Sequence, residues 1–161
     1  MNTASIAEIK KELLETHPSK VLELCLRLAK FKKENKELLT FLLFEAHDIE
    51  SYIENVKNEM CKQFKLINKS NAYFVKKSLR KILRATNKYI RYSNSEMVEI
   101  ELLIYFLIQV KEFDNSIKTN TVIYNIYQNQ LKKIQKTMET LHEELQYDYL
   151  KKITALKSIT A

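Results

Sequence analysis

The chain contains no glycine, one proline and no tryptophan among its 161 residues. Glycine supplies the positive φ angles of tight hairpin turns and bulges, so a sheet protein of this size without glycine would be hard to build. The same absence excludes glycine-rich phosphate loops, the dinucleotide-binding fingerprint and the usual nucleophile elbow. The composition therefore indicates a helical protein and argues against several large classes of enzyme.

Cysteine and histidine are scarce, and their spacing predicts no metal site. Cys25 and Cys61 lie in separate segments, and because cysteine is among the residue types most often buried, we expect no disulfide, metal or catalytic role for either. The three histidines do not pair with one another at metal-ligand spacing: His17, His47 and His142. One Glu-x-x-His, Glu139 to His142, matches the ligand spacing of di-iron bundles, but the chain holds no second copy. We predict a surface pair there, and neither a metal nor a cofactor.

Long apolar runs are also missing. The longest, Leu102 to Ile108, has seven residues, whereas a membrane-spanning helix needs about 20. Residues 1–17 are charged and amphipathic, which does not match an export signal. We therefore expect a soluble, cytoplasmic protein that does not contact a membrane.

What is present indicates a folded helical domain. The sequence is 45% hydrophobic and 29% charged, a balance typical of folded proteins. Apolar residues recur at helical spacing from end to end, and no stretch alternates as a strand does. We predict a single all-α domain, residues 1–161, built as a bundle of about six helices. The predicted helices span residues 6–16, 18–32, 35–67, 71–92, 95–113 and 121–156.

Three of these helices carry expectations about packing. The helices at 35–67 and 121–156 are long, and their apolar residues recur in steps of three and four, which is typical of coiled-coil packing. We expect these two to pair, antiparallel. In the helix at 95–113 apolar residues occupy almost every side, which places it at the buried centre.

The first predicted helix has a defined start and an apolar stripe. Ser5 and Glu8 are spaced as a capping box. Ile6, Ile9 and Leu13 then share one side, which we expect to face inward.

Acidic residues are absent from one long segment. Residues 60–95 hold ten of the 27 Lys and Arg and no Asp or Glu, so this segment carries +10 and the rest of the chain, with 17 basic and 20 acidic residues, carries −3. Three of the four arginines lie there. The basic character of the protein is therefore concentrated in one predicted helix and the residues before it.

On a helix at residues 71–92 the charges and the apolar residues separate into opposite arcs. With 100° per residue, most of the basic side chains fall within about 120°. The candidate anion-binding residues are Lys76, Lys77, Arg80, Lys81, Arg84, Lys88 and Arg91. Tyr73 falls within this arc and is a candidate for stacking, with Phe74 and Tyr92 along its border. Basic residues with an aromatic among them are what binding to a phosphate backbone with some base stacking would use.

Two interpretations of this arc stay open. Any amphipathic helix needs a polar face, and the arc could be solvated or neutralised by carboxylates of neighbouring helices, such as Glu45, Asp48, Glu50 and Glu54. In the second interpretation, the basic arc contacts an anionic partner. Nucleic acid is favoured over an acidic protein, and a membrane is disfavoured because the opposite face is needed for the core.

The leading hypothesis is a non-enzymatic binding protein whose basic helix contacts an anionic partner. Nucleic acid is the favoured partner. The alternative is a helical interaction module that forms a homo-oligomer through its long helices. A helical-bundle enzyme or metalloprotein is the third hypothesis. Glu99 and Glu101 could serve acid–base chemistry if buried, but they are two residues apart and therefore on different faces. We infer no catalytic residue and no small-molecule substrate.

Overall fold

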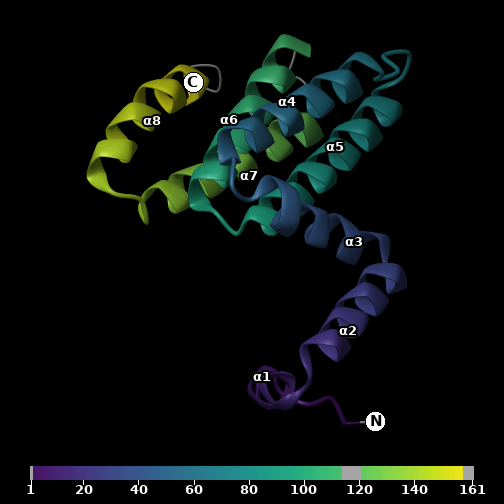
Figure 1. The fold of residues 1–161 in the computed structure, drawn as a ribbon. Coiled ribbons are helices and arrows are strands. Elements are labelled where there is room, and N and C mark those ends of the chain that lie inside the picture. Colours follow the sequence, from purple (N-terminus) through teal and green to yellow (C-terminus); the bar gives the residue numbers. More distant parts are fainter. Residues whose placement is uncertain (1, 114–120, 158–161) are drawn as a thin grey trace. The chain divides into compact units, whose positions relative to one another are not determined.

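The computed structural model describes residues 2–113 and 121–157 (Figure 1). The described residues form helices and no strands, so the all-α prediction is confirmed. The chain divides into two compact units, Met1–Phe44 and Glu45–Ala161, which we treat separately. That residues 1–161 form a single domain stays a prediction.

The predicted count of six helices is wrong. The described ranges hold eight α-helices and one π-helical turn. The first unit contains α1 (Ile6–Glu15), α2 (Pro18–Phe31), α3 (Lys33–Thr40) and most of the π-helical turn η1 (Phe41–Glu45). The second contains α4 (Ile49–Lys65), α5 (Ala72–Ser93), α6 (Glu96–Phe113), α7 (Thr121–Met138) and α8 (Glu143–Lys157).

The helix predicted at 35–67 is interrupted after η1. Asp48 adopts a non-helical conformation, and its Oδ1 accepts a hydrogen bond from the backbone N–H of Ser51 at 3.0 Å. This is an N-cap, which begins α4 as a new helix. Helix α3 in turn begins at Lys33, directly after α2 ends at Phe31. The interruption contains neither glycine nor proline, so it left no strong signal in the sequence.

The helix predicted at 121–156 is likewise two helices. It is interrupted between Met138 and Glu143, where the hydroxyl of Thr140 donates to the carbonyl of Thr137 at 2.6 Å. A threonine hydroxyl that binds a nearby carbonyl competes with the helical hydrogen-bond pattern.

In the first unit, the capping box of α1 is confirmed. Ser5 Oγ accepts from the N–H of Glu8 at 3.3 Å, and Glu8 Oε2 accepts from the N–H of Ser5 at 2.7 Å. The predicted inward stripe is wrong, because Ile6, Ile9 and Leu13 are 81%, 41% and 39% exposed. None of α1, α2 and α3 contains a buried residue.

The core of the second unit is built around α6. Eight residues of α6 are buried, and α4, α5, α7 and α8 all pack against it. The prediction that this helix is central is therefore confirmed. The principal contacts of α4 and of α7 are with α6, so the predicted direct pairing of the two long helices is wrong.

Two tyrosine hydroxyls tie helices of this unit together. Tyr52 of α4 donates to the backbone carbonyl of Tyr89 in α5 at 2.9 Å. Tyr127 of α7 donates to the carbonyl of Leu156 in α8 at 3.2 Å, and burial raises the pKa of Tyr127 to about 12. These bonds fix the positions of α5 and α8 against their neighbours.

None of the helices in the described ranges has both the length and the apolar character needed to cross a membrane.

Candidate nucleic-acid interface

Helix α5 has well-defined ends, although neither glycine nor proline marks them. The side chain of Asn71 accepts a hydrogen bond from the backbone N–H of Tyr73 at 2.8 Å, which caps the first turn. At the other end Asn94 adopts the left-handed conformation with φ 48°, and its N–H donates to the carbonyl of Ile90 at 3.2 Å. Asparagine is one of the few residues besides glycine that adopt this conformation readily.

One side of α5 belongs to the core. Its buried residues are Val75, Leu79, Ile82, Thr86 and Ile90. The hydroxyl of Thr86 donates to the carbonyl of Ile82 at 3.0 Å, so its burial leaves no unpaired polar group. The rotational position of the helix is therefore fixed by its apolar side.

The seven candidate residues lie on the opposite side of α5, and we call them the basic face: Lys76, Lys77, Arg80, Lys81, Arg84, Lys88 and Arg91. Lys77, Arg80, Lys81, Arg84 and Arg91 are exposed, whereas Lys76 and Lys88 are partly exposed. The structure thus brings all the predicted residues to one surface.

Lys88 lies against aromatic rings at one edge of this face. Its Nζ is 5.2 Å from the ring centroid of Tyr89 and 6.0 Å from that of Tyr92. These two rings meet edge to face, with centroids 6.3 Å apart. The ammonium group is therefore held near α5 by cation–π contacts.

No carboxylate in the described ranges comes within ion-pair distance of the other six basic side chains. Of the carboxylates that could have neutralised the face, Asp48 caps α4. Glu54 forms an ion pair with Lys57 at 3.0 Å. Neither Glu45 nor Glu50 forms an ion pair with any of these six side chains in this part of the chain. The charges of these six side chains are therefore not neutralised by carboxylates in the described ranges.

Two exposed aromatic rings lie at the N-terminal end of α5. Tyr73 is 64% exposed and Phe74 is 45% exposed. Their ring centroids are 5.7 Å apart with an interplanar angle of 73°. Tyr73 was predicted from the sequence as a stacking residue. Phe74 was placed only at the border of the arc, and its partial exposure beside Tyr73 is a result of the structure.

Helix α5 packs mainly against α4 and α6 of its unit. Tyr52 of α4 donates to the carbonyl of Tyr89. Nζ of Lys133 in α7 donates to Oδ1 of Asn87 at 3.2 Å. The basic face is therefore carried by a helix that is supported by packing and hydrogen bonds.

The two α6 carboxylates considered for acid–base chemistry are used in ion pairs. Glu99 Oε1 lies 3.4 Å from Lys133 Nζ. Glu101 contacts Lys57 at 3.4 Å and Lys152 at 3.1 Å. Burial alone would raise the pKa of Glu101, but the hydrogen bonds and charges of the two lysines outweigh burial and keep that pKa below its ordinary value. Glu99 and Glu101 therefore contact residues of different helices, as their two-residue spacing predicted.

No group of three His, Cys, Asp or Glu side chains with metal-binding geometry occurs among the residues that the structure describes. Glu139 and His142 are both exposed, as expected of a surface pair. Cys25 is exposed, contrary to the expectation of burial, and Cys61 is partly exposed. The side of α2 that carries Cys25 lacks the packing that would bury it.

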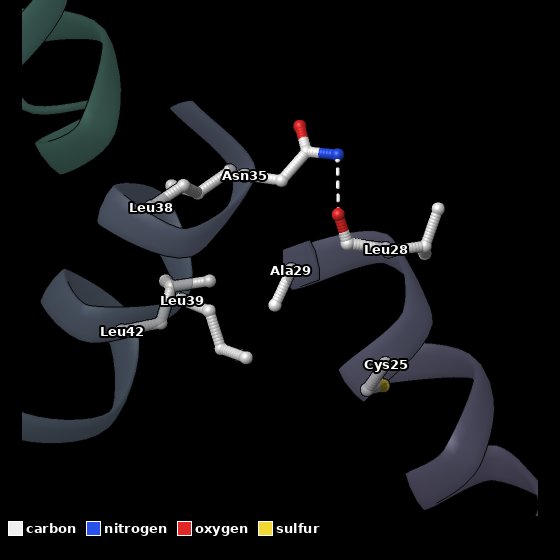
Figure 2. A pocket seen from close by; sticks show the side chains of 7 residues that line it. All are labelled: Cys25, Leu28, Ala29, Asn35, Leu38, Leu39 and Leu42. Carbon is white, nitrogen blue, oxygen red and sulfur yellow. Dashed lines mark hydrogen bonds between the residues drawn. The ribbon is translucent and has the colours of Figure 1, made fainter. Parts of the chain in front are cut away.

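A separate apolar pocket occurs in the first unit, between α2 and α3 (Figure 2). Its volume is about 310 Å³. The lining residues are Cys25, Leu28, Ala29, Asn35, Leu38, Leu39 and Leu42. Figure 2 shows the amide of Asn35 at its edge, where Nδ2 donates to the carbonyl of Leu28 at 2.9 Å. The pocket was not predicted from the sequence.

Comparison of the chain with protein-family models, with curated proteins and with solved structures finds no match.

Proposed function

We propose that the protein is a non-enzymatic nucleic-acid-binding protein and that the basic face of α5 contacts the phosphate backbone. The observation that carries the proposal is the set of exposed Lys and Arg side chains, of which Arg80, Arg84 and Arg91 have no carboxylate partner in the described ranges. Arginine suits this role because its planar guanidinium binds phosphate oxygens through two parallel hydrogen bonds.

The shape of the face supports a linear polyanion as the partner. Lys76, Arg80 and Arg84 follow one another at steps of four residues, which places them about 6 Å apart along the helix axis. From Lys76 to Arg91 the face extends about 22 Å. A membrane surface is disfavoured, because binding in the lipid interface needs an apolar face and the apolar face of α5 is buried in the core.

Salt dependence tests the proposal directly. If four or five phosphates of a single strand are contacted, the logarithm of the affinity should fall with the logarithm of the salt concentration at a slope of about −3 to −3.5, since each contact releases bound counterions. Fluorescence polarisation of a labelled 20-nucleotide strand, titrated at several NaCl concentrations, measures the slope. Binding that does not respond to salt would contradict the proposal.

A second candidate function, self-association, is supported by the first unit. Its large apolar side chains are mostly exposed, with Leu14 at 77% and Phe31 at 75%. Residues 2–44 carry eight basic and six acidic residues, so two copies would repel each other little. The stripes of α4 and α7, which the sequence suggested as an oligomer interface, are buried in the second unit. We propose that a second copy of this chain covers the apolar side of α2 and α3.

Light scattering after size-exclusion chromatography tests this candidate. We expect the mass of the wild-type protein to rise from 19.2 kDa toward twice that value as the concentration increases. The double variant Leu28→Lys and Leu42→Lys, at the pocket, should remain at the monomer mass because two charges cannot be buried without partners. Leu66→Lys is the matched control, since Leu66 is 84% exposed in the second unit. A constant monomer mass for the wild type would exclude self-association.

A further inference from the structure

Tyr73 and the arginines of α5 lie on one line along the helix. Tyr73 and Arg91 are 18 residues apart, which is five complete turns, and Arg80 and Arg84 deviate from this line by only about 20° each. Tyr73 is more exposed than any other aromatic residue of α5. A nucleic-acid strand whose phosphates contact the three arginines would therefore reach the Tyr73 ring at the N-terminal end of α5.

The basic face offers little for reading adenine or cytosine edges in a duplex. Helix α5 contains no Asp, Glu or Gln, and its one side-chain amide is Asn87. That amide is already used, since Nδ2 donates to the carbonyl of Leu83 at 3.0 Å and Oδ1 accepts from Lys133. Amide and carboxylate groups are the usual partners of adenine and cytosine edges, whereas Arg and Lys bind guanine edges as well as phosphates, so direct readout of base edges here is limited to guanine.

The exposed ring of Tyr73 suits an unpaired base better than a duplex. In a duplex both faces of a base are covered by its stacked neighbours, and unstacking one base costs a few kcal/mol. A single strand already presents unstacked bases, so one of them can turn toward Tyr73.

We infer that the partner is a single-stranded polynucleotide, whose phosphates lie along Arg80, Arg84 and Arg91 and whose unpaired base stacks on the exposed pair Tyr73 and Phe74. The inference rests on the proposed function and names the class of nucleic acid that the face binds. Every base has a flat aromatic surface, so stacking on this pair tolerates any sequence.

Three labelled probes with different bases and pairing separate stacking from charge. The first is a single-stranded 12-nucleotide oligothymidylate, the second is an abasic strand with the same number of phosphates, and the third is a 12-base-pair duplex. We expect the wild-type protein to bind oligothymidylate about 5- to 100-fold more tightly than the abasic strand, because one or more bases stack. Oligouridylate, titrated in parallel, reports any preference between DNA and RNA.

The double variant Tyr73→Ala and Phe74→Ala should weaken binding of oligothymidylate about tenfold and change binding of the abasic strand less than twofold. Tyr73→Phe should bind as the wild type does, because the ring is retained. Tyr147→Ala is the matched control: Tyr147 is 62% exposed on α8, and Lys151 Nζ lies 5.1 Å from its ring centroid. This variant should bind all three probes normally.

The outcomes distinguish this inference from the proposed function. If the double variant leaves oligothymidylate binding unchanged, or weakens both strands equally, stacking is overturned while phosphate binding stands. If the duplex binds as tightly as oligothymidylate, the single-stranded assignment is overturned. If the wild type binds none of the probes, both the inference and the proposed function fail. Circular dichroism melting confirms that each variant is folded.

Discussion

Reversing three charges, Arg80→Glu, Arg84→Glu and Arg91→Glu, is expected to weaken nucleic-acid binding at least about 100-fold at 0.1 M salt. The substitutions remove three cations that lie on one line of α5, and they place three carboxylates where phosphates would bind. All three arginines are exposed, and none has a carboxylate partner in the described ranges. Fluorescence polarisation with a labelled single strand measures the loss.

A control with the same change in net charge separates the face from the overall charge of the protein. Lys111, Lys136 and Lys151 are exposed on α6, α7 and α8, outside the basic face. Changing these three to Glu lowers the net charge from +7 by the same six units. We expect the control to retain most of its binding, because short-range contacts rather than net charge dominate at this ionic strength. Equal losses in both triple variants would contradict a localised site.

The arginine variant should keep its fold. Surface substitutions that break no buried contact usually change the free energy of unfolding by no more than about 0.5 kcal/mol each. The core side of α5 is untouched in this variant. Thermal unfolding followed by circular dichroism should therefore give a transition close to that of the wild type. A large fall in melting temperature would show that the arginines have a structural role.

The second large effect concerns stability. Phe106→Ala is expected to lower the free energy of unfolding by about 3–5 kcal/mol, because it removes a ring from the packed centre of α6 and leaves a cavity. Phe106 has 0% exposure, and its ring centroid lies 5.8 Å from that of Phe64 in α4. The variant therefore weakens the contact between two helices as well as the core itself.

Urea denaturation followed at 222 nm measures this change. Phe31→Ala is the control, since Phe31 is 75% exposed in the first unit and its removal should change the free energy of unfolding by less than about 1 kcal/mol. Equal effects of the two substitutions would show that α6 is not the main stabilising helix. A loss below 1 kcal/mol for Phe106→Ala would lead to the same conclusion.

Local sequence patterns predicted the helices that have strong boundary signals or one dominant environment. Asn71 and Asn94 lie at the two ends of α5, close to the predicted range of 71–92. Helix α6 was recognised as central because apolar residues surround it. In both cases the information lies within one helical segment, so no knowledge of distant residues was needed.

The errors occurred where local signals were weak or where packing decided the result. The interruption before Ile49 depends on the Asp48 cap, and the one after Met138 on a threonine hydroxyl, so neither contains a helix-breaking residue. The stripe of Ile6, Ile9 and Leu13 has the same periodicity as a buried stripe. Periodicity shows that a helix has an apolar side, but it does not show that another element covers that side.

By itself, the sequence determined that the protein is helical and that α5 has one apolar and one basic side, because spacing along a single helix sets both. Only the tertiary structure decided which charges are paired. Glu101 pairs with Lys57 and Lys152, which are 44 and 51 residues away along the chain. The exposed arginines of α5 have no such partner in the described ranges. Ion pairing depends on distances of a few ångströms between remote residues, and these distances exist only once the helices have packed.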